Sequence, residues 1–100
     1  MISTLDTRGY FSCTTPEPYG VLGIIVIWNG PVVSLGMKVV QALAAGNCVV
    51  VKPSEFTPFA PYLYARLLSE TGVPDGVSSI VSGGAEVGGA QVCHPKVERR

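Results

Sequence analysis

The sequence predicts an α/β protein with an incomplete Rossmann-like parallel sheet, in the order β-α-β-α-β-α. Three short apolar runs rich in β-branched residues alternate with longer segments of helical periodicity. The connections between them are short and contain proline or glycine, which is typical of loops. One hundred residues allow at most one domain, and a 47% hydrophobic fraction is high for so short a chain.

The first eighteen residues differ in composition from the rest. They are polar, rich in threonine and without clear periodicity. We expect an irregular N-terminal segment over residues 1–18, whether a loop, an edge segment or a divergent terminus. Residues 19–100 are expected to form the partial domain.

The first predicted strand covers residues 21–27, which are apolar on both faces, as in a parallel strand covered by helices on both sides. Pro31 suits the first turn of the next helix, where its missing N–H needs no partner. Gly46-Asn47 ends this helix, and residues 48–51 form a second short buried strand. The apolar face of the helix is expected from residues at helical spacing, namely Val33, Met37, Val40 and Ala44.

A second helix follows three prolines that interrupt the chain. Thr57 is the predicted N-cap and Pro58 the first helical residue. Gly72 and Pro74 are expected to end the helix. The expected apolar face consists of Phe59, Leu63 and Leu67.

The last predicted elements are a weak strand and a glycine-rich helix. Pro74-Asp75-Gly76 predicts a turn into a strand over residues 77–81. Residues 85–93 form the helix, which His94-Pro95 ends. A fourth strand is expected after this helix, so the sequence looks cut short.

Composition excludes several classes of function. The formal net charge is zero and the basic residues are scattered, so no nucleic-acid partner is expected. The longest apolar run is far shorter than the roughly 20 residues that span a bilayer, so no membrane association is expected. Three cysteines without paired spacing argue against a disulfide framework and favour a cytoplasmic location. No metal site is predicted.

Polar side chains follow the first two predicted strands. Trp28-Asn29 comes after the first strand, and Lys52-Pro53-Ser54-Glu55 after the second. Ligands of open α/β sheets bind at this carboxyl edge, so we expect a nucleotide-sized site here. The alternatives are that Asn29 is a turn residue before Gly-Pro, and that Lys52 and Glu55 are a solvated surface pair.

Several motifs, in order and with matching spacing over roughly residues 17–97, which is most of the chain, closely resemble the aldehyde dehydrogenase superfamily. They include Trp28-Asn29-Gly30-Pro31, Ala42-Leu43-Ala44-Ala45-Gly46-Asn47, Lys52-Pro53-Ser54-Glu55, Glu70-Thr71-Gly72-Val73-Pro74-Asp75-Gly76, Gly84, Gly88 and His94-Pro95.

The resemblance implies a role for each polar residue at the two strand ends. Asn29 would be the oxyanion-hole asparagine, whose amide stabilises the tetrahedral thiohemiacetal. Lys52 and Glu55 would hold the adenosine ribose of NAD, with Ser54 beside them. A carboxylate at Glu55 disfavours the 2′-phosphate of NADP, although this preference is soft in the family and leaves NADP open.

The resemblance also assigns residues that give the cofactor close access to the backbone. Gly84 and Gly88 would let the last helix approach the cofactor, with Ser82 in place of a usual first glycine. Ile25, Val26 and Trp28 would contribute backbone and ring surface. Ile27 replaces a usual proline before the tryptophan, which is expected to loosen the turn that aims the asparagine.

The family's reaction needs a thiolate nucleophile and a glutamate base, and it oxidises an aldehyde to a carboxylic acid with NAD(P)+. Cys48 is expected to be buried and inert, and a Cys93–His94 dyad is not expected. The resemblance implies that nucleophile and base follow Arg100 in a parent enzyme that is a homo-oligomer. We therefore expect this chain alone to be inactive. The alternative is a non-catalytic dinucleotide-binding or subunit-interaction remnant.

Overall fold

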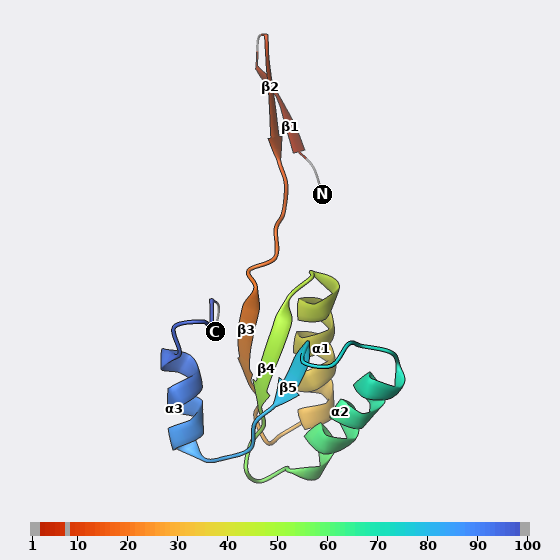
Figure 1. The fold of residues 1–100 in the computed structure, drawn as a ribbon, viewed down its shortest axis with the longest axis vertical. Helices are drawn as coiled ribbons and strands as arrows, with labels where there is room; N and C mark the ends of the chain where they lie inside the picture. The colour runs from red at the N-terminus through yellow and green to blue at the C-terminus, as the bar shows by residue number, and fades with distance from the viewer. Residues whose placement is uncertain (1–2, 8, 99–100) are drawn as a thin grey trace.

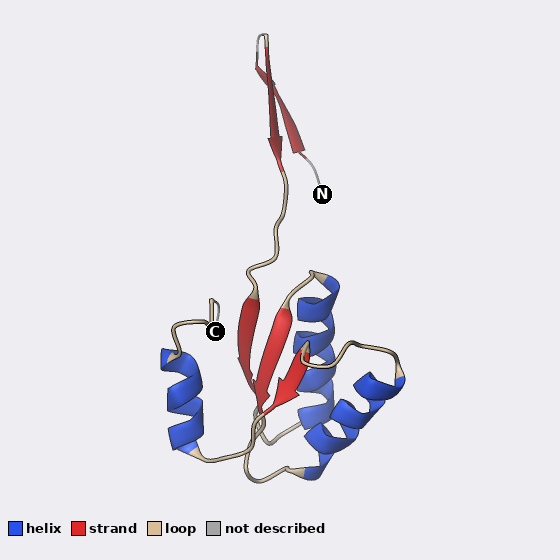
Figure 2. Ribbon diagram, in the orientation of Figure 1, coloured by secondary structure: helices blue, strands red, loops and turns tan. Residues whose placement is uncertain are grey.

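The computed structural model describes residues 3–7 and 9–98. Figure 1 labels its elements in chain order, and Figure 2 colours them by type. They are β1 (Ser3–Thr7), β2 (Tyr10–Thr14), β3 (Val21–Ile25), α1 (Pro31–Ala44), β4 (Cys48–Lys52), α2 (Phe59–Glu70), β5 (Ser78–Ile80) and α3 (Ala85–Cys93).

The main sheet is parallel and has the strand order β3-β4-β5. α1 and α2 lie on one face of the sheet, and α3 lies on the other (Figures 1 and 2). This arrangement confirms the predicted α/β class and the β-α-β-α-β-α order from β3 to α3. It places the carboxyl ends of all three strands at one edge.

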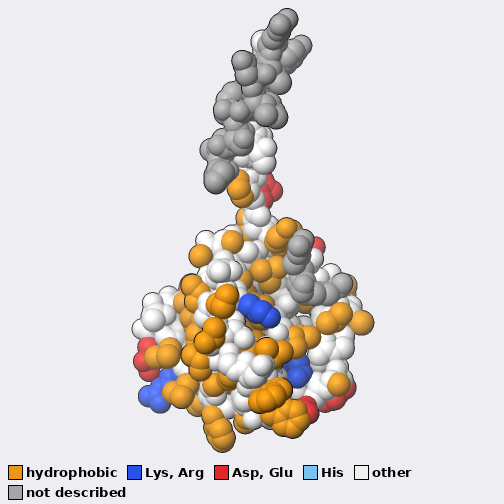
Figure 3. Space-filling model, turned by 180° about the vertical axis from the view of Figure 1, so that it is seen from behind, with side chains coloured by type: hydrophobic (Ala, Val, Ile, Leu, Met, Phe, Trp, Pro, Cys, Tyr) orange, Lys and Arg blue, Asp and Glu red, His pale blue; other side chains and the backbone are white. Residues whose placement is uncertain are grey.

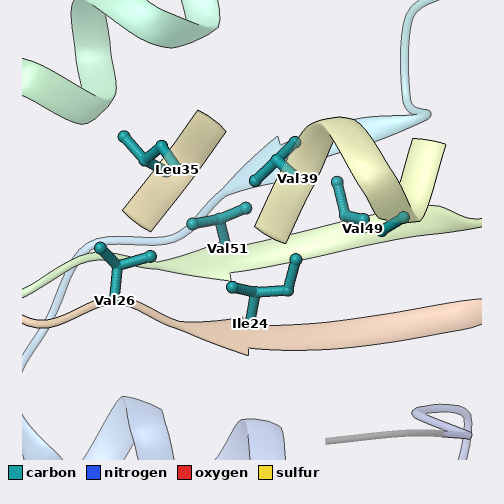
Figure 4. Packing of buried hydrophobic residues seen from close by; sticks show 7 residues of the cluster. Ile24, Val26, Leu35, Val39, Val49 and Val51 are labelled. Carbon is teal, nitrogen blue, oxygen red and sulfur yellow. The ribbon is translucent and has the colours of Figure 1, made fainter. Parts of the chain in front are cut away.

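The core lies between α1 and the sheet (Figure 4). Its buried side chains come from β3 and the residue after it, from α1 and from β4. They are Ile24, Val26, Leu35, Val39, Ala42, Val49 and Val51. The prediction that Val33, Met37 and Val40 form the buried face of α1 was wrong, because Met37 is 62% exposed and the two valines also face solvent. α1 is apolar on nearly all sides, so helical spacing alone fits more than one face.

The expected apolar face of α2 is also exposed. Phe59, Leu63 and Leu67 all face solvent, whereas Tyr64 and Leu68 pack against the core. Figure 3 shows many hydrophobic side chains on one outer face of the molecule. The predicted N-cap was wrong as well, because α2 begins at Phe59 with Pro58 as its N-cap, and no side chain caps it.

The N-terminal segment is not irregular as predicted. β1 and β2 pair antiparallel as a hairpin, with Ser3 opposite Thr14. The hairpin projects from the domain (Figure 1). Its sequence is polar and lacks the alternation of a half-buried strand, which explains why the pattern did not reveal it.

Asn47 joins the end of α1 to the start of the sheet. Gly46 has a φ of +83°, a left-handed conformation that suits glycine at a helix end. The buried Asn47 amide then donates to Ala42 O and accepts from Gly20 N–H, both at 3.1 Å. The predicted stop at Gly46-Asn47 is confirmed.

β3 is less buried than predicted. Ile25 is 45% exposed, and Ile27, just beyond the end of β3, is exposed too, so the helices on the two faces cover this strand only in part. After α3 the chain returns to β3, where Glu98 N–H donates to Val21 O at 3.0 Å. Cys48, expected to be buried, is exposed at the start of β4.

Candidate functional site

The ends of β3 and β4 lie side by side. Ile25 is the ladder partner of Lys52, and Val26 N–H donates to Lys52 O at 3.0 Å. The segments that carry Asn29 and Lys52, which are 23 positions apart in the sequence, therefore leave the sheet from neighbouring strands. The predicted edge site thus has a rigid base in the sheet.

Lys52 is the most enclosed ionisable residue of the site, with only 7% of its surface exposed. Its Nζ donates to Pro53 O at 3.1 Å, which uses one of the three ammonium hydrogens. Its stem lies beside α3: a Cβ built on Gly88 would lie 3.5 Å from Lys52 Cδ and 3.8 Å from Ile25 Cδ1. Three of the predicted residues therefore meet here.

A second group of predicted residues meets at the start of α3. A Cβ built on Gly84 would lie 3.3 Å from Glu55 Oε2. Ser54 lies on the same connection, and its Oγ accepts from Phe56 N–H at 3.3 Å. Gly84, the N-cap of α3, thus lies against Glu55, and Gly88 inside α3 lies against Lys52 at the end of β4.

Glu86 belongs to this group, although sequence reasoning did not single it out. Its Oε1 accepts from Gly84 N–H at 3.1 Å, and its Oε2 would lie 2.8 Å from a Cβ on Gly84. The Glu86 and Gly84 N–H groups, and to a smaller extent the Lys52 ammonium, hold the pKa of the Glu86 carboxyl below its ordinary value. An acidic residue in the first turn of a predicted helix is a signal that would have found it.

Asn29 lies on the connection between β3 and α1. Gly30, with φ +74° and ψ +47°, turns the chain into the helix, and Pro31 follows in its first turn. Trp28 and Asn29 are both exposed. Among the described residues no hydrogen bond joins the Asn29 amide to Lys52, Ser54 or Glu55, so the amide is available to an external acceptor.

A large groove lies elsewhere in the described part of the chain. It has a volume of about 780 Å³ and follows β3, with Lys38, Gln41 and Gln91 among its lining residues. Of the predicted site residues only Ile25 lines it. The groove therefore reflects the partly uncovered strand rather than the polar edge site.

The cysteines and the histidine of the described residues form no further site. Cys13, Cys48 and Cys93 are free and exposed. His94 Nδ1 accepts from Lys96 N–H at 3.2 Å, which is a local turn contact. Within residues 3–7 and 9–98 no cluster of three metal-ligating side chains occurs, and no helix there is long and apolar enough to cross a bilayer.

A parallel α/β sheet with an ammonium, a carboxylate and two close glycines at its carboxyl edge defines the class of Rossmann-like ligand-binding domains. Comparison with known proteins narrows this class. A model of the aldehyde dehydrogenase family matches residues 1–99, so the chain belongs to that family.

Relatives and solved structures agree with this assignment. The chain is 49% identical over 83 residues to 3-succinoylsemialdehyde-pyridine dehydrogenase of Pseudomonas sp, covering 82% of this chain and 17% of that protein. It is 47% identical over 93 residues to a probable betaine aldehyde dehydrogenase of Schizosaccharomyces pombe, covering 92% of this chain and 19% of that protein.

Among solved structures, a putative aldehyde dehydrogenase from Burkholderia cenocepacia superposes with a TM-score of 0.92 at 42% identity, covering 96% of this chain and 21% of that one. The NAD+ complex of an aldehyde dehydrogenase from Bacillus cereus superposes with a TM-score of 0.92 at 37% sequence identity, covering 97% of this chain and 20% of that one. The chain thus spans about a fifth of the length of these proteins.

Proposed function

We propose that this chain supplies the adenosine end of the cofactor site, and the oxyanion asparagine, of an NAD-dependent aldehyde dehydrogenase. The protein would oxidise an aldehyde to a carboxylic acid, with NADP as the less favoured acceptor. The observation that carries the proposal is the convergence of Lys52, Glu55, Gly84 and Gly88 at the end of β4. The similar Bacillus cereus enzyme was solved as its NAD+ complex, which supports the choice of cofactor.

The donors and acceptors present fit a ribose. The enclosed Lys52 ammonium has two hydrogens beyond its bond to Pro53 O, and the exposed Glu55 carboxylate accepts from hydroxyl groups. Gly84 is only half-buried and has no side chain, so a ligand can lie close to the backbone at the start of α3, whereas the buried Gly88 leaves room for the Lys52 stem. The cofactor, when bound, supplies the hydride acceptor.

Asn29 would act at the other end of the site. Its amide N–H would donate to the substrate carbonyl oxygen as that oxygen becomes negative during attack by a nucleophile. The positive end of α1 begins one residue beyond Gly30 and adds a favourable field for the same charge. The nucleophile and the general base are expected outside residues 1–100.

NAD titration into the purified chain tests the cofactor site. Lys52→Met keeps most of the apolar stem but removes the charge, and it should weaken NAD binding about tenfold or more, as expected for a charged hydrogen bond. Lys96→Met is the matched control at an exposed lysine and should leave the affinity unchanged. Equal affinity of Lys52→Met and the unaltered chain would contradict the proposed site.

The coding DNA on both sides of these residues tests the catalytic assignment. A continuation that carries a cysteine and a glutamate motif supports the enzyme. An immediate stop codon supports the non-catalytic remnant instead. We further propose that the protein resides in the reducing cytoplasm, because the three cysteines are free, and that it is a homo-oligomer, as the family resemblance implies.

A further inference from the structure

We propose that Glu86 is a second acidic determinant of cofactor choice, which acts with Glu55 to disfavour a 2′-phosphate on the adenosine ribose. The inference rests on the proposed function, because it places the ribose at Lys52 and Glu55. It adds a residue that neither the motifs nor the family assignment singled out. Its basis is the position of the Glu86 carboxylate.

The two carboxylates lie against the same point of α3. A Cβ built on Gly84 would lie 2.8 Å from Glu86 Oε2 and 3.3 Å from Glu55 Oε2. Glu86 is on the helix and Glu55 on the loop after β4, so the two acids converge from separate elements. A ligand that reaches Glu55 across Gly84 therefore also approaches Glu86.

The Glu86 carboxylate also occupies the place that an anion would take. The start of a helix attracts anions, because its first N–H groups lack partners within the helix. Here Gly84 N–H already donates to Glu86 Oε1 at 3.1 Å. A phosphate at this end of α3 would have to displace a bonded carboxylate of the same charge sign.

Lys52 is the cation that faces this pair. Its stem passes over Gly88, one turn along α3 from Gly84, and its ammonium bonds to Pro53 O. One cation thus stands against two carboxylates. A ribose, which is neutral, is compatible with this balance, whereas a dianionic 2′-phosphate adds repulsion from both acids.

The test measures the dissociation constants of NAD and NADP by calorimetry, on the full chain and on Glu86→Gln. The glutamine keeps an oxygen that can accept from Gly84 N–H, so it removes the charge and preserves the contact. The ratio of the NADP constant to the NAD constant should fall about tenfold, and less at high salt because the ions screen the charge. Glu70→Gln, whose carboxylate pairs with Arg66 on the exposed side of α2, should leave the ratio unchanged.

The outcomes separate this inference from the proposed function. Failure of the unaltered chain to bind NAD would overturn the proposed function. Binding of NAD with the same NADP to NAD ratio in Glu86→Gln as in the unaltered chain would overturn only the role of Glu86. Glu55→Gln should also lower the ratio, but it should weaken the binding of NAD itself, because an NH2 donor replaces one of the two carboxylate oxygens that accept from the ribose hydroxyls and the charge that strengthens these bonds is lost.

Discussion

Gly23→Ala should destabilise the domain, because the middle of β3 has no room for a methyl group. A Cβ at this position would lie 2.8 Å from Gln91 Nε2, 3.1 Å from Val97 Cγ1 and 3.3 Å from Gln91 Cγ. The Gln91 side chain would have to move, and it is only 8% exposed and donates to Val50 O at 2.9 Å.

The magnitude follows from three terms. Overpacking a core position costs about 1–3 kcal/mol. Weakening the hydrogen bond from Gln91 Nε2 to Val50 O when the side chain moves adds about 0.5–1.5 kcal/mol to this cost. The lower entropy of the unfolded chain offsets about 0.4–1 kcal/mol. We expect the free energy of unfolding, measured by urea titration with circular dichroism, to fall by about 0.5–4 kcal/mol, with about 2 kcal/mol as the central value.

Gly36→Ala is the matched control for this substitution. No heavy atom lies within 4 Å of a Cβ on Gly36, which is inside α1. The same added methyl should therefore stabilise the protein by about 0.5–1 kcal/mol. Gln91→Ala should remove most of the penalty of Gly23→Ala in a double-mutant cycle. Equal effects of the two glycine substitutions would refute the reasoning.

Three further predictions concern stability. Leu35→Ala should lower the free energy of unfolding by about 2–5 kcal/mol, because this side chain is fully buried. Val40→Ala, on the exposed face of α1, should change it by less than about 0.5 kcal/mol. Similar losses for the two variants in urea titrations would contradict a core between Leu35 and the sheet. Asn47→Ala removes both side-chain hydrogen bonds at the end of α1 and should cost about 1–3 kcal/mol in the same titration; no loss would be inconsistent with a structural amide. Burial raises the pKa of the Tyr64 hydroxyl. The contribution of this group to stability is therefore fully present below the unfolded pKa of about 10 and is lost as pH rises through the folded value. Above a pH of about 10 the urea midpoint should fall less steeply with pH in Tyr64→Phe than in the unaltered chain, and identical pH dependence of the two midpoints would refute this assignment.

From β3 to α3, element type and order were predictable because local signals agreed. Pro31 begins α1, and the left-handed Gly46 and Gly72 follow the ends of α1 and α2. Val77 N–H donates to Pro74 O across the predicted turn. Each of these signals depends on the conformation of one or two residues, so no tertiary information was needed.

The buried faces of the helices were not predictable in the same way. α1 contains valines, leucines and a methionine on almost every side, so Val33, Met37 and Val40 fit a helical stripe as well as Leu35 and Val39 do. The sheet packs against only one of these stripes. Tertiary contact decides between faces that hydrophobic spacing leaves equal.

The candidate site shows the same division between local and tertiary information. Lys52, Ser54 and Glu55 were found because they follow a strand, which is a property of the sequence. The place of Glu86 depends on how α3 packs across the sheet, which brings Gly84 against Glu55. Gln91 is the clearest case, because its amide reaches a backbone carbonyl 41 positions away and, within the described residues, its buried Oε1 has no hydrogen-bond partner. Moving Gln91 would break its bond to Val50 O and leave two more buried polar atoms without partners, so this bond holds α3 against the strands that carry the site.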